Sequence, residues 1–233
     1  MKREAHSGKV LYKKKLTDNV IDLKIEKPAN FDYKAGQFIQ LHIPDPEGKR
    51  EYLLRAYSLC SIPSDESIAL CIKIVPDGLG SLFINQTKIG DSLSFYGPAG
   101  QFTVNESNSP LHFVATGVGM APIIALIREE LEVRNNKQNI DLLFGLYHEK
   151  DIFWFELLEG LTEKYKNFKY NITLSEPSEH WKGLREIVTK HLPEEVDKDS
   201  HYYLCGNPNM VNDVKNYLIE HDLPKTNIHH EIF

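Results

Sequence analysis

The hydrophobic residues in the first half of the chain fall at every second position in short runs. Apolar and polar side chains alternate along 21–26, 39–43 and 68–74, among other segments between residues 9 and 103. A period of two is typical of strands that bury one face. The runs are separated by segments containing proline, glycine and aspartate, which favour turns. This pattern predicts a small closed antiparallel barrel rather than a helical or doubly wound domain.

After a polar segment at residues 105–110, the pattern changes to buried strands separated by helical segments. Strands are predicted at 111–115, 140–146, 170–174, 202–204 and 228–233. Helices are predicted at 122–134, 153–165, 183–191 and 210–221. Such helical crossovers imply a parallel sheet, which binds ligands at the carboxyl ends of its strands. We therefore expect two domains, 1–106 and 107–233.

The composition narrows the classes of partner. Lysine and arginine together number 27 and aspartate and glutamate 33, so the formal net charge is −6. A nucleic-acid partner needs a basic face that this balance does not suggest, so none is expected. The N-terminal residues lack the apolar core of a signal peptide, and no run of about 18 apolar residues could span a membrane. We expect a cytoplasmic protein without a membrane span.

Neither the cysteines nor the histidines form a metal-binding pattern. Cys60, Cys71 and Cys205 are widely spaced and lack C-x-x-C or iron–sulfur spacing. The histidines, including the pair at 229–230, show no ligand grouping with nearby carboxylates. We therefore expect no metal site and no iron–sulfur cluster, and we predict that the cysteines are thiols in a reducing compartment.

Candidate chemistry begins at residues 55–58, which follow an apolar run suited to a strand. Arg55 can form a forked pair of hydrogen bonds with a diphosphate. Beyond Ala56, the ring of Tyr57 can lie against a planar ring system, and the Ser58 hydroxyl can hydrogen-bond a ring nitrogen. A dinucleotide with an aromatic head group needs all three contacts. The alternative is an ordinary strand with an exposed arginine, a half-buried tyrosine and an edge serine.

A glycine-rich turn at residues 78–81 is predicted to open a helix. Free backbone N–H groups and the helix dipole favour an anion at such a position. We expect Ser81 to be both the N-cap of this helix and a phosphate donor. The alternative is a plain hairpin turn followed by a capped helix.

The carboxyl ends of two predicted strands in the second half carry further signals. Residues 116–122 join a strand to a helix, and Gly117 and Gly119 there allow close backbone approach to a pyrophosphate. Residues 205–210 repeat the arrangement after a later strand. Cys205 is either a residue at the ligand or a small buried hydrophobe, the usual environment of a free cysteine.

Taken in order, the motifs at 55–58, 78–81, 97–100, 116–122 and 205–210 resemble those of the ferredoxin-NADP reductase superfamily. The resemblance covers essentially the whole chain. It implies an N-terminal six-stranded antiparallel barrel that binds a flavin and a C-terminal parallel-sheet domain that binds NAD(P)H, with the flavin ring in the cleft between them. It also implies FAD rather than FMN. This choice comes from the resemblance alone, because residues 78–81 indicate a phosphate-binding turn but not an adenine site.

The resemblance also implies roles for single residues. Arg55 would hold the flavin diphosphate, Tyr57 would pack on the flavin or bond its ribityl chain, and Ser58 would hydrogen-bond near N5. Phe233 would be a gate that the nicotinamide displaces; alternatively it is a core residue ending the last strand. The expected catalytic residues are Ser58, Cys205, Glu231 and Phe233. The expected cofactor-binding residues are Arg55, Ala56, Tyr57, Ser58, Lys73, Gly80, Ser81, Thr116, Gly117, Gly119, Pro122, Ser175, Glu176, Gly206, Met210 and Phe233.

The implied reaction is hydride transfer from C4 of the nicotinamide to N5 of the flavin, after which electrons leave to a separate acceptor. The acceptor would be a ferredoxin, a flavodoxin or an oxygenase component, because the cysteines cannot hold a cluster. Two alternatives stay open. One is an NAD(P)H:flavin reductase that uses free flavin as a substrate, and the other is a non-catalytic electron-relay or nucleotide-sensing subunit of a larger complex.

Ser175 and Glu176 follow a predicted strand at the point where the ribose of the adenosine half is expected. NADP-specific relatives tend to have an arginine after that serine. A carboxylate there accepts a hydrogen bond from a 2′-hydroxyl and repels a 2′-phosphate, so NADH is slightly favoured over NADPH. Lys182 and Arg185 lie nearby in the sequence and could bind a phosphate instead. Glu186 stands where relatives have glycine, which leaves the path of this loop open.

Overall fold

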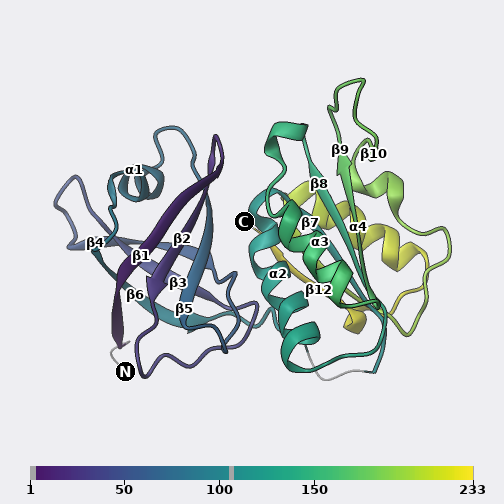
Figure 1. Cartoon of the computed structure of the whole chain (residues 1–233), viewed down its shortest axis with the longest axis horizontal. Coiled ribbons are helices and arrows are strands. Elements are labelled where there is room, and N and C mark those ends of the chain that lie inside the picture. The colour runs from purple at the N-terminus through teal and green to yellow at the C-terminus, as the bar shows by residue number, and fades with distance from the viewer. Residues whose placement is uncertain (1–3, 105–107, 233) are drawn as a thin grey trace.

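The computed structural model describes residues 4–104 and 108–232. Figure 1 shows two halves side by side along the long axis, an N-terminal β domain and a C-terminal α/β domain. The expected boundary between residues 106 and 107 lies outside the described residues and stays a prediction. Among the described residues, no helix is both long enough and apolar enough to cross a membrane.

The N-terminal half is a six-stranded antiparallel sheet in the order β4-β3-β6-β1-β2-β5. An isolated bridge between Leu59 and Leu70 joins the end of β4 to β5, so the two edges of the sheet meet. This confirms the expected barrel. The strands are β1 (Ala5–Thr17), β2 (Val20–Glu26), β3 (Phe38–Pro44), β4 (Tyr52–Ser58), β5 (Ser67–Lys73) and β6 (Ser92–Ala99).

The alternation in the sequence decides which side chains fill the barrel. Ile21, Leu23 and Ile25 on β2, and Ile39 and Leu41 on β3, are each at most 2% exposed. They belong to one buried cluster inside the barrel. Burying each such side chain stabilises the fold by roughly 1.5–3 kcal/mol. Because this interior is packed with side chains, a ligand must bind outside it.

One helix, α1 (Leu79–Gln86), lies between β5 and β6 in the chain. This confirms the predicted helix, but the expectation that Ser81 is its N-cap is wrong. Gly78 holds the N-cap position without a side-chain bond, and Ser81 lies within the helix. The Ser81 hydroxyl instead accepts a hydrogen bond from the backbone N–H of Val75 at 2.9 Å, which ties the loop before α1 to its first turn.

The other end of α1 is held by Lys13 on β1. The Lys13 ammonium donates hydrogen bonds to the carbonyl oxygens of Ile84, Asn85 and Thr87 at 2.7, 2.9 and 2.7 Å. The last carbonyls of a helix have no partner within it, and a cation is favourable there. Since both ends of α1 are bonded to the barrel, its first turn has a defined position beside β4.

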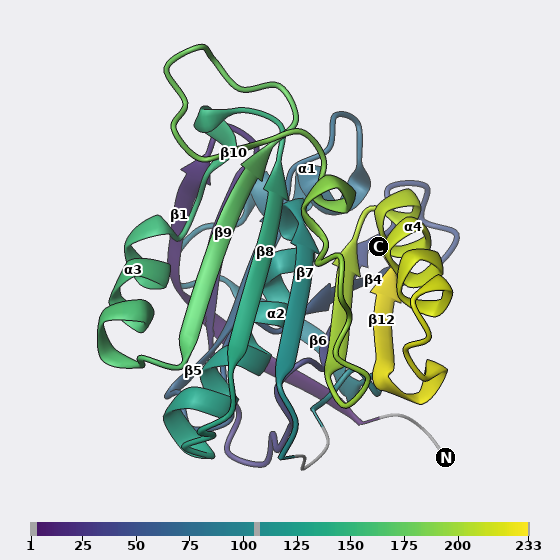
Figure 2. The same ribbon diagram turned by 90° about the vertical axis from the view of Figure 1, so that its right-hand side faces the viewer.

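The C-terminal half is a six-stranded parallel sheet in the order β10-β9-β8-β7-β11-β12, seen face-on in Figure 2. The first strand, β7, has β8 on one side and β11 on the other, so the strand order reverses at β7. Ligands of such sheets bind at the carboxyl ends of the strands at this reversal. The strands are β7 (Leu111–Thr116), β8 (Ile140–Leu146), β9 (Phe168–Leu174), β10 (Leu184–Arg185), β11 (His201–Gly206) and β12 (Ile228–Ile232).

Helices cover both faces of this sheet. The helices α2 (Met120–Arg128) and α3 (Phe155–Lys164) pack on the face toward the barrel, and α4 (Pro208–Glu220) packs on the opposite face (Figure 1). The buried cluster around α2 continues into the barrel and includes Phe102, whose ring lies 5.9 Å from that of Tyr203 on β11. The two halves therefore share apolar packing.

The predicted helix at 122–134 begins earlier and ends differently. A 3₁₀ turn at Gly117–Gly119 precedes α2, and Glu129–Val133 continues it as a π-helix. Where the helix type changes, the Arg128 guanidinium donates hydrogen bonds at 2.8 and 3.0 Å to the two carboxylate oxygens of Asp65, which lies in a barrel loop. This paired geometry adds a polar link between the halves.

The expectation of a helix at 183–191 is wrong. Residues 184–185 form the short strand β10 beside β9, and a 3₁₀ turn follows at Val188–His191. Between them, Glu186 has a φ of 79°. This left-handed conformation is incompatible with a right-handed helix. The chain therefore turns at this residue.

Candidate functional site

The end of β4 and the first turn of α1 lie against each other. A Cβ atom on Gly80 would lie 2.5 Å from Oη of Tyr57 and 3.4 Å from Cγ of Arg55, so only glycine fits without movement. Arg55 is exposed, and its guanidinium donates a hydrogen bond to the Leu54 carbonyl at 2.8 Å. The first turn of α1 has no side-chain cap. A cation, a tyrosine and backbone N–H groups thus meet at one place.

A second contact joins the end of β4 to the last strand of the other half. The Ser58 hydroxyl donates a hydrogen bond to Oε1 of Glu231 at 3.3 Å, and Ser58 is only 4% exposed. Burial raises the pKa of the Glu231 carboxyl, while the bond from Ser58 opposes this shift. Two of the expected catalytic residues, one from each half of the chain, are therefore adjacent. Phe233 lies outside the described residues.

The raised pKa of Glu231 predicts a pH-dependent effect of Glu231→Gln on stability. A carboxyl that holds its proton more tightly in the folded protein stabilises it below the usual glutamate pKa, and this contribution is lost as pH rises through the raised pKa. Glutamine stays neutral, so the melting temperature of the variant relative to the unaltered protein should increase from about pH 4 to about pH 8. Thermal melts across this range test it, and a constant difference would contradict it.

A cleft of about 690 Å³ opens at the carboxyl ends of β7, β8 and β11. Its walls come from both halves. Lys73 at the end of β5 and Val75 just after it belong to the barrel, while the other lining residues belong mainly to the α/β domain. The position is the reversal of strand order at β7. The expected cofactor-binding residues that line it are Lys73, Thr116, Gly117, Gly119, Ser175, Gly206 and Met210.

Three glycines shape this cleft. Gly117 has a φ of 55°, and a Cβ added there would meet no atom within 4 Å. A Cβ on Gly119 would lie 2.3 Å from the carbonyl oxygen of Cys205, and one on Gly206 would lie 2.3 Å from Oγ1 of Thr116. The ends of β7 and β11 are therefore in close backbone contact, with open space beside Gly117.

Several expected residues lie away from the cleft. Cys205 is fully buried and does not line it, and burial raises the pKa of its thiol. This environment matches the alternative of a small buried hydrophobe. Pro122 is buried in the first turn of α2, and Ala56 is exposed on β4 between Arg55 and Tyr57. The described residues contain no cluster of side chains suited to a metal ion.

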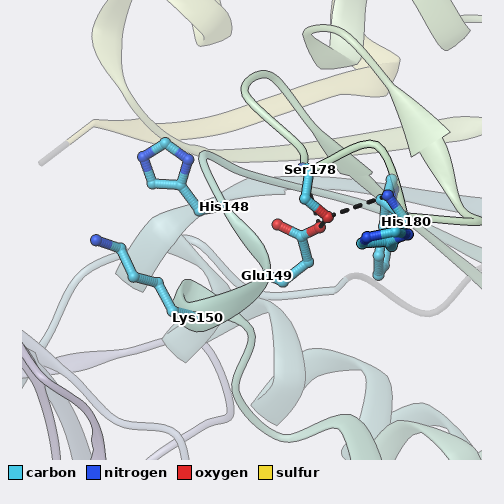
Figure 3. Close-up of a pocket in the computed structure, with 6 residues that line it drawn as sticks. His148, Glu149, Lys150, Ser178 and His180 are labelled. Atoms are coloured by element: carbon cyan, nitrogen blue, oxygen red, sulfur yellow. Dashed lines mark hydrogen bonds between the residues drawn. The ribbon is translucent and has the colours of Figure 1, made fainter.

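A second cavity, of about 590 Å³, lies at the loops that follow β8 and β9 (Figure 3). Figure 3 shows the Ser178 hydroxyl directed at the carboxylate of Glu149, to which it donates a hydrogen bond. The exposed carboxylate of Glu176 lies 3.7 Å from Nε2 of His148 at the same edge. The lining residues are His148, Glu149, Lys150, Ser178, His180 and Trp181.

Arg185 and Lys182, the two cations near Glu176 that could bind a phosphate, lie in different environments. Nη2 of Arg185 donates hydrogen bonds to the carbonyl oxygens of Ser178, Glu179 and Trp181 at 2.8, 3.3 and 3.1 Å. This guanidinium group therefore holds the loop between β9 and β10. Lys182 is exposed and lines neither cavity.

Both halves match known families over most of their length. Residues 7–104 match the oxidoreductase FAD-binding domain, and residues 113–216 match the oxidoreductase NAD-binding domain. Ferredoxin–NADP reductase B of Sorangium cellulosum is 31% identical over 98% of this chain and 97% of its own length. The chain belongs to the ferredoxin-NADP reductase superfamily. Membership confirms the expected two-domain fold, the flavoenzyme oxidoreductase class, and FAD and NAD(P)H as the cofactors.

Some other members of the superfamily are longer. The electron transfer component of toluate 1,2-dioxygenase from Pseudomonas putida is 28% identical over 94% of this chain, which spans 65% of that relative. Among solved structures, the FAD/NAD-binding domain of nitric oxide dioxygenase from Vibrio cholerae has a TM-score of 0.87 and 25% identity, and the match covers 99% of both chains. This match extends over both the FAD-binding and the NAD-binding domain.

Sequence reasoning missed several residues that line the cleft of this superfamily member. Asn209 and Asp213 lie on α4, four residues apart and hence on one face of the helix. That spacing was visible in the sequence, but which face meets the cleft depends on the packing of α4. Glu186 also lines the cleft. Its signal was the absence of the glycine found in relatives.

Proposed function

We propose that the protein is an NAD(P)H oxidoreductase that holds FAD and passes electrons to a separate acceptor, such as a ferredoxin, a flavodoxin or an oxygenase component. The hydrogen bond between Ser58 and Glu231 carries this proposal, because it joins the expected flavin-binding strand to the nucleotide-binding domain. The cleft lined by both halves supports it. Domains of 1–106 and 107–233 and a cytoplasmic location, consistent with three free cysteines, complete the proposal.

The residues at the end of β4 fit a flavin dinucleotide. Arg55 supplies an exposed guanidinium group, and the first turn of α1 supplies N–H groups without a side-chain cap. Gly80 keeps this turn against Tyr57, and the Ser81 hydroxyl fixes the preceding loop. A diphosphate needs such a combination of a forked cation and backbone donors. Tyr57 offers an aromatic surface beside it, and Lys73 a further cation at the cleft.

The larger cleft fits the nicotinamide dinucleotide. Gly117 and Gly119 allow the backbone at the end of β7 to approach a pyrophosphate, while Gly206 and Met210 would lie beside the nicotinamide half. When both cofactors are bound, they supply hydride transfer, and the protein supplies position and electrostatics. Ser58 positions its hydroxyl at the junction. The Glu231 carboxyl beside it retains a proton more readily than an exposed carboxyl group, because burial raises its pKa.

Relatives favour a protein acceptor over free flavin. The related proteins are described as a ferredoxin–NADP reductase and as electron transfer components of dioxygenases. A flavin reductase would hold its flavin weakly as a substrate, and a relay or sensing subunit would not oxidise NAD(P)H. Retention of FAD rather than FMN through purification, measured by the visible spectrum and by analysis of the released flavin, separates these alternatives.

Anaerobic titration of the purified protein with NADH, and separately with NADPH, tests the proposed function. We expect the absorption bands of a bound flavin to bleach within the turnover time of the enzyme. A protein that stays colourless with added FAD, or whose flavin neither nucleotide bleaches, would overturn the proposal.

We propose that NADH is preferred, with Glu176 as one determinant. Its carboxylate is exposed at the end of β9, and Arg185 is bonded to three carbonyl groups and so cannot easily serve a phosphate. We expect Glu176→Arg to raise kcat/KM for NADPH by about tenfold to a hundredfold, because it replaces a repulsive charge by a bidentate phosphate ligand. Steady-state kinetics with both nucleotides measure it, and an unchanged ratio would exclude this role.

A further inference from the structure

Glu186 combines two features that no other described residue shares. It has a positive φ of 79° without being glycine, and it lines the 690 Å³ cleft. A residue other than glycine in this region is unusual, and a glutamate lacks the short side chain with which asparagine or aspartate stabilises it. Strained backbone of this kind persists where the surrounding structure fixes it, often at a functional site.

The backbone N–H and the backbone carbonyl group of Glu186 are both hydrogen-bonded to β9. Its N–H donates a hydrogen bond to the carbonyl oxygen of Leu174 at 2.8 Å, and its carbonyl oxygen accepts one from Oγ1 of Thr173 at 2.6 Å. The next turn packs over β8, since a Cβ on Gly145 would lie 2.6 Å from Cγ1 of Val188. Glu186 is therefore held in the wall of the cleft at the end of β9, and the turn that follows it reaches β8.

This position lies at the ribose end of the proposed nucleotide site. In the sheet, β8 separates β7, whose end carries Gly117 and Gly119, from β9, which is followed by Ser175. A dinucleotide with its pyrophosphate at the former would place its adenosine ribose near the latter, beside Glu186, which is bonded to β9. Glu186 is exposed, and its carboxylate forms no hydrogen bond or ion pair with the described parts of the chain.

The charges of the cleft lining also disfavour an additional phosphate group. Lys73 is the one cation among the described residues that line the cleft, whereas Asp151, Glu186 and Asp213 are acidic. Carboxylates accept hydrogen bonds from ribose hydroxyl groups, and they repel further phosphate. The lining therefore accepts a dinucleotide with two phosphate groups more readily than one with three.

We propose that Glu186 is a second specificity-determining residue, which acts against the additional phosphate of NADPH independently of Glu176. This inference rests on the proposed function, since it assumes that the cleft binds the nicotinamide dinucleotide. The strained backbone holds the carboxylate in the wall of the cleft, where glycine would place no charge.

Three variants test the proposal. Glu186→Gln removes the charge and keeps the size, Glu186→Gly also removes the backbone strain, and Glu179→Gln removes a carboxylate from the same loop at an exposed residue that lines neither cavity. We expect Glu186→Gln to raise kcat/KM for NADPH by about five- to tenfold, and that for NADH by less than about twofold. The gain should shrink at high salt, because screening weakens the repulsion.

Glu186→Gly should show the same shift in preference and a higher melting temperature, because glycine adopts a positive φ without strain. Glu179→Gln should change neither quantity. Binding constants of NAD⁺ and NADP⁺ to the oxidised protein provide a readout that does not depend on turnover.

The outcomes separate the two proposals. If Glu186→Gln changes both nucleotides equally or changes neither, Glu186 does not determine specificity, even where Glu176→Arg shifts the preference. If the protein binds neither nucleotide and its flavin is not reduced, the proposed function fails, and the role of Glu186 fails with it.

Discussion

Arg55→Ala is expected to give a folded protein that loses its flavin during purification. The Arg55 side chain lies beside Gly80, at the uncapped first turn of α1, and is exposed. Truncating it removes a charge-assisted, forked contact to a diphosphate, and it breaks only the hydrogen bond to the Leu54 carbonyl within the described structure. We expect the loss to weaken FAD binding by about 3 kcal/mol, or about a hundredfold.

Two further arginine variants make this test specific. Arg55→Lys keeps the charge but not the planar fork, so its FAD affinity should lie between those of the unaltered protein and of Arg55→Ala. Arg50→Ala removes another exposed arginine, from the turn between β3 and β4, and should keep its flavin. The flavin content after gel filtration and the dissociation constant from FAD titration are the measurements. Unchanged affinity in Arg55→Ala would exclude the proposed diphosphate site.

The sequence predicted those parts of the fold whose periodicity reflects burial. In β2, the alternation of Ile21, Leu23 and Ile25 with polar residues matches the buried and solvent-facing sides of the barrel. The parallel strand at 140–146 was predicted at its observed bounds, because both of its faces are covered and the segment reads as nearly continuous apolar residues.

Elements near the cleft were harder to predict because hydrogen bonds to residues outside each segment decide them. The segment 183–191 has apolar residues at helical spacing, but the bonds of Glu186 to β9 hold the chain in a turn. Ser81 resembles an N-cap in sequence, yet its hydroxyl bonds the N–H of Val75 in the loop before the helix. Local propensity is overridden where a backbone partner elsewhere in the fold is available.

In the candidate site too, some features could be predicted from the sequence and others could not. Arg55, Tyr57 and Gly80 could be grouped in advance because they belong to short motifs, and the structure brings them into contact. The neighbours of a motif residue are not encoded in the motif. Cys205 stands at a strand end that meets the cleft, but its side chain points into the core, because the alternation of β11 presents it to the buried cluster around α2.

Gly119→Ala is expected to disrupt nucleotide binding while the flavin site stays intact. The added Cβ would lie 2.3 Å from the Cys205 carbonyl oxygen and 2.5 Å from Cα of Gly206, and backbone atoms of a central strand cannot move aside cheaply. Overpacking of this kind destabilises by about 1–3 kcal/mol or more. The ends of β7 and β11 must then separate, and we expect kcat/KM for NADH to fall by about a hundredfold.

Two other glycine-to-alanine variants distinguish damage to the fold from damage to the site. Gly117→Ala meets no atom within 4 Å, so its methyl group should occupy space in the cleft and raise the KM for NADH at a small loss of stability from its φ of 55°. Gly160→Ala lies in α3 with no atom near its added Cβ, and it should leave catalysis unchanged and stabilise the helix by up to about 1 kcal/mol.

These three variants, compared by melting temperature, FAD content and nucleotide titration, assign separate roles to the two cleft glycines. A Gly119→Ala protein that loses FAD along with nucleotide binding would indicate global unfolding. A Gly117→Ala protein with an unaltered KM would show that the pyrophosphate does not pass close to the backbone at the end of β7. The expected combination is retained FAD in all three and weakened nucleotide binding in two, because the flavin contacts belong to β4 and α1 and the nucleotide contacts to the parallel sheet.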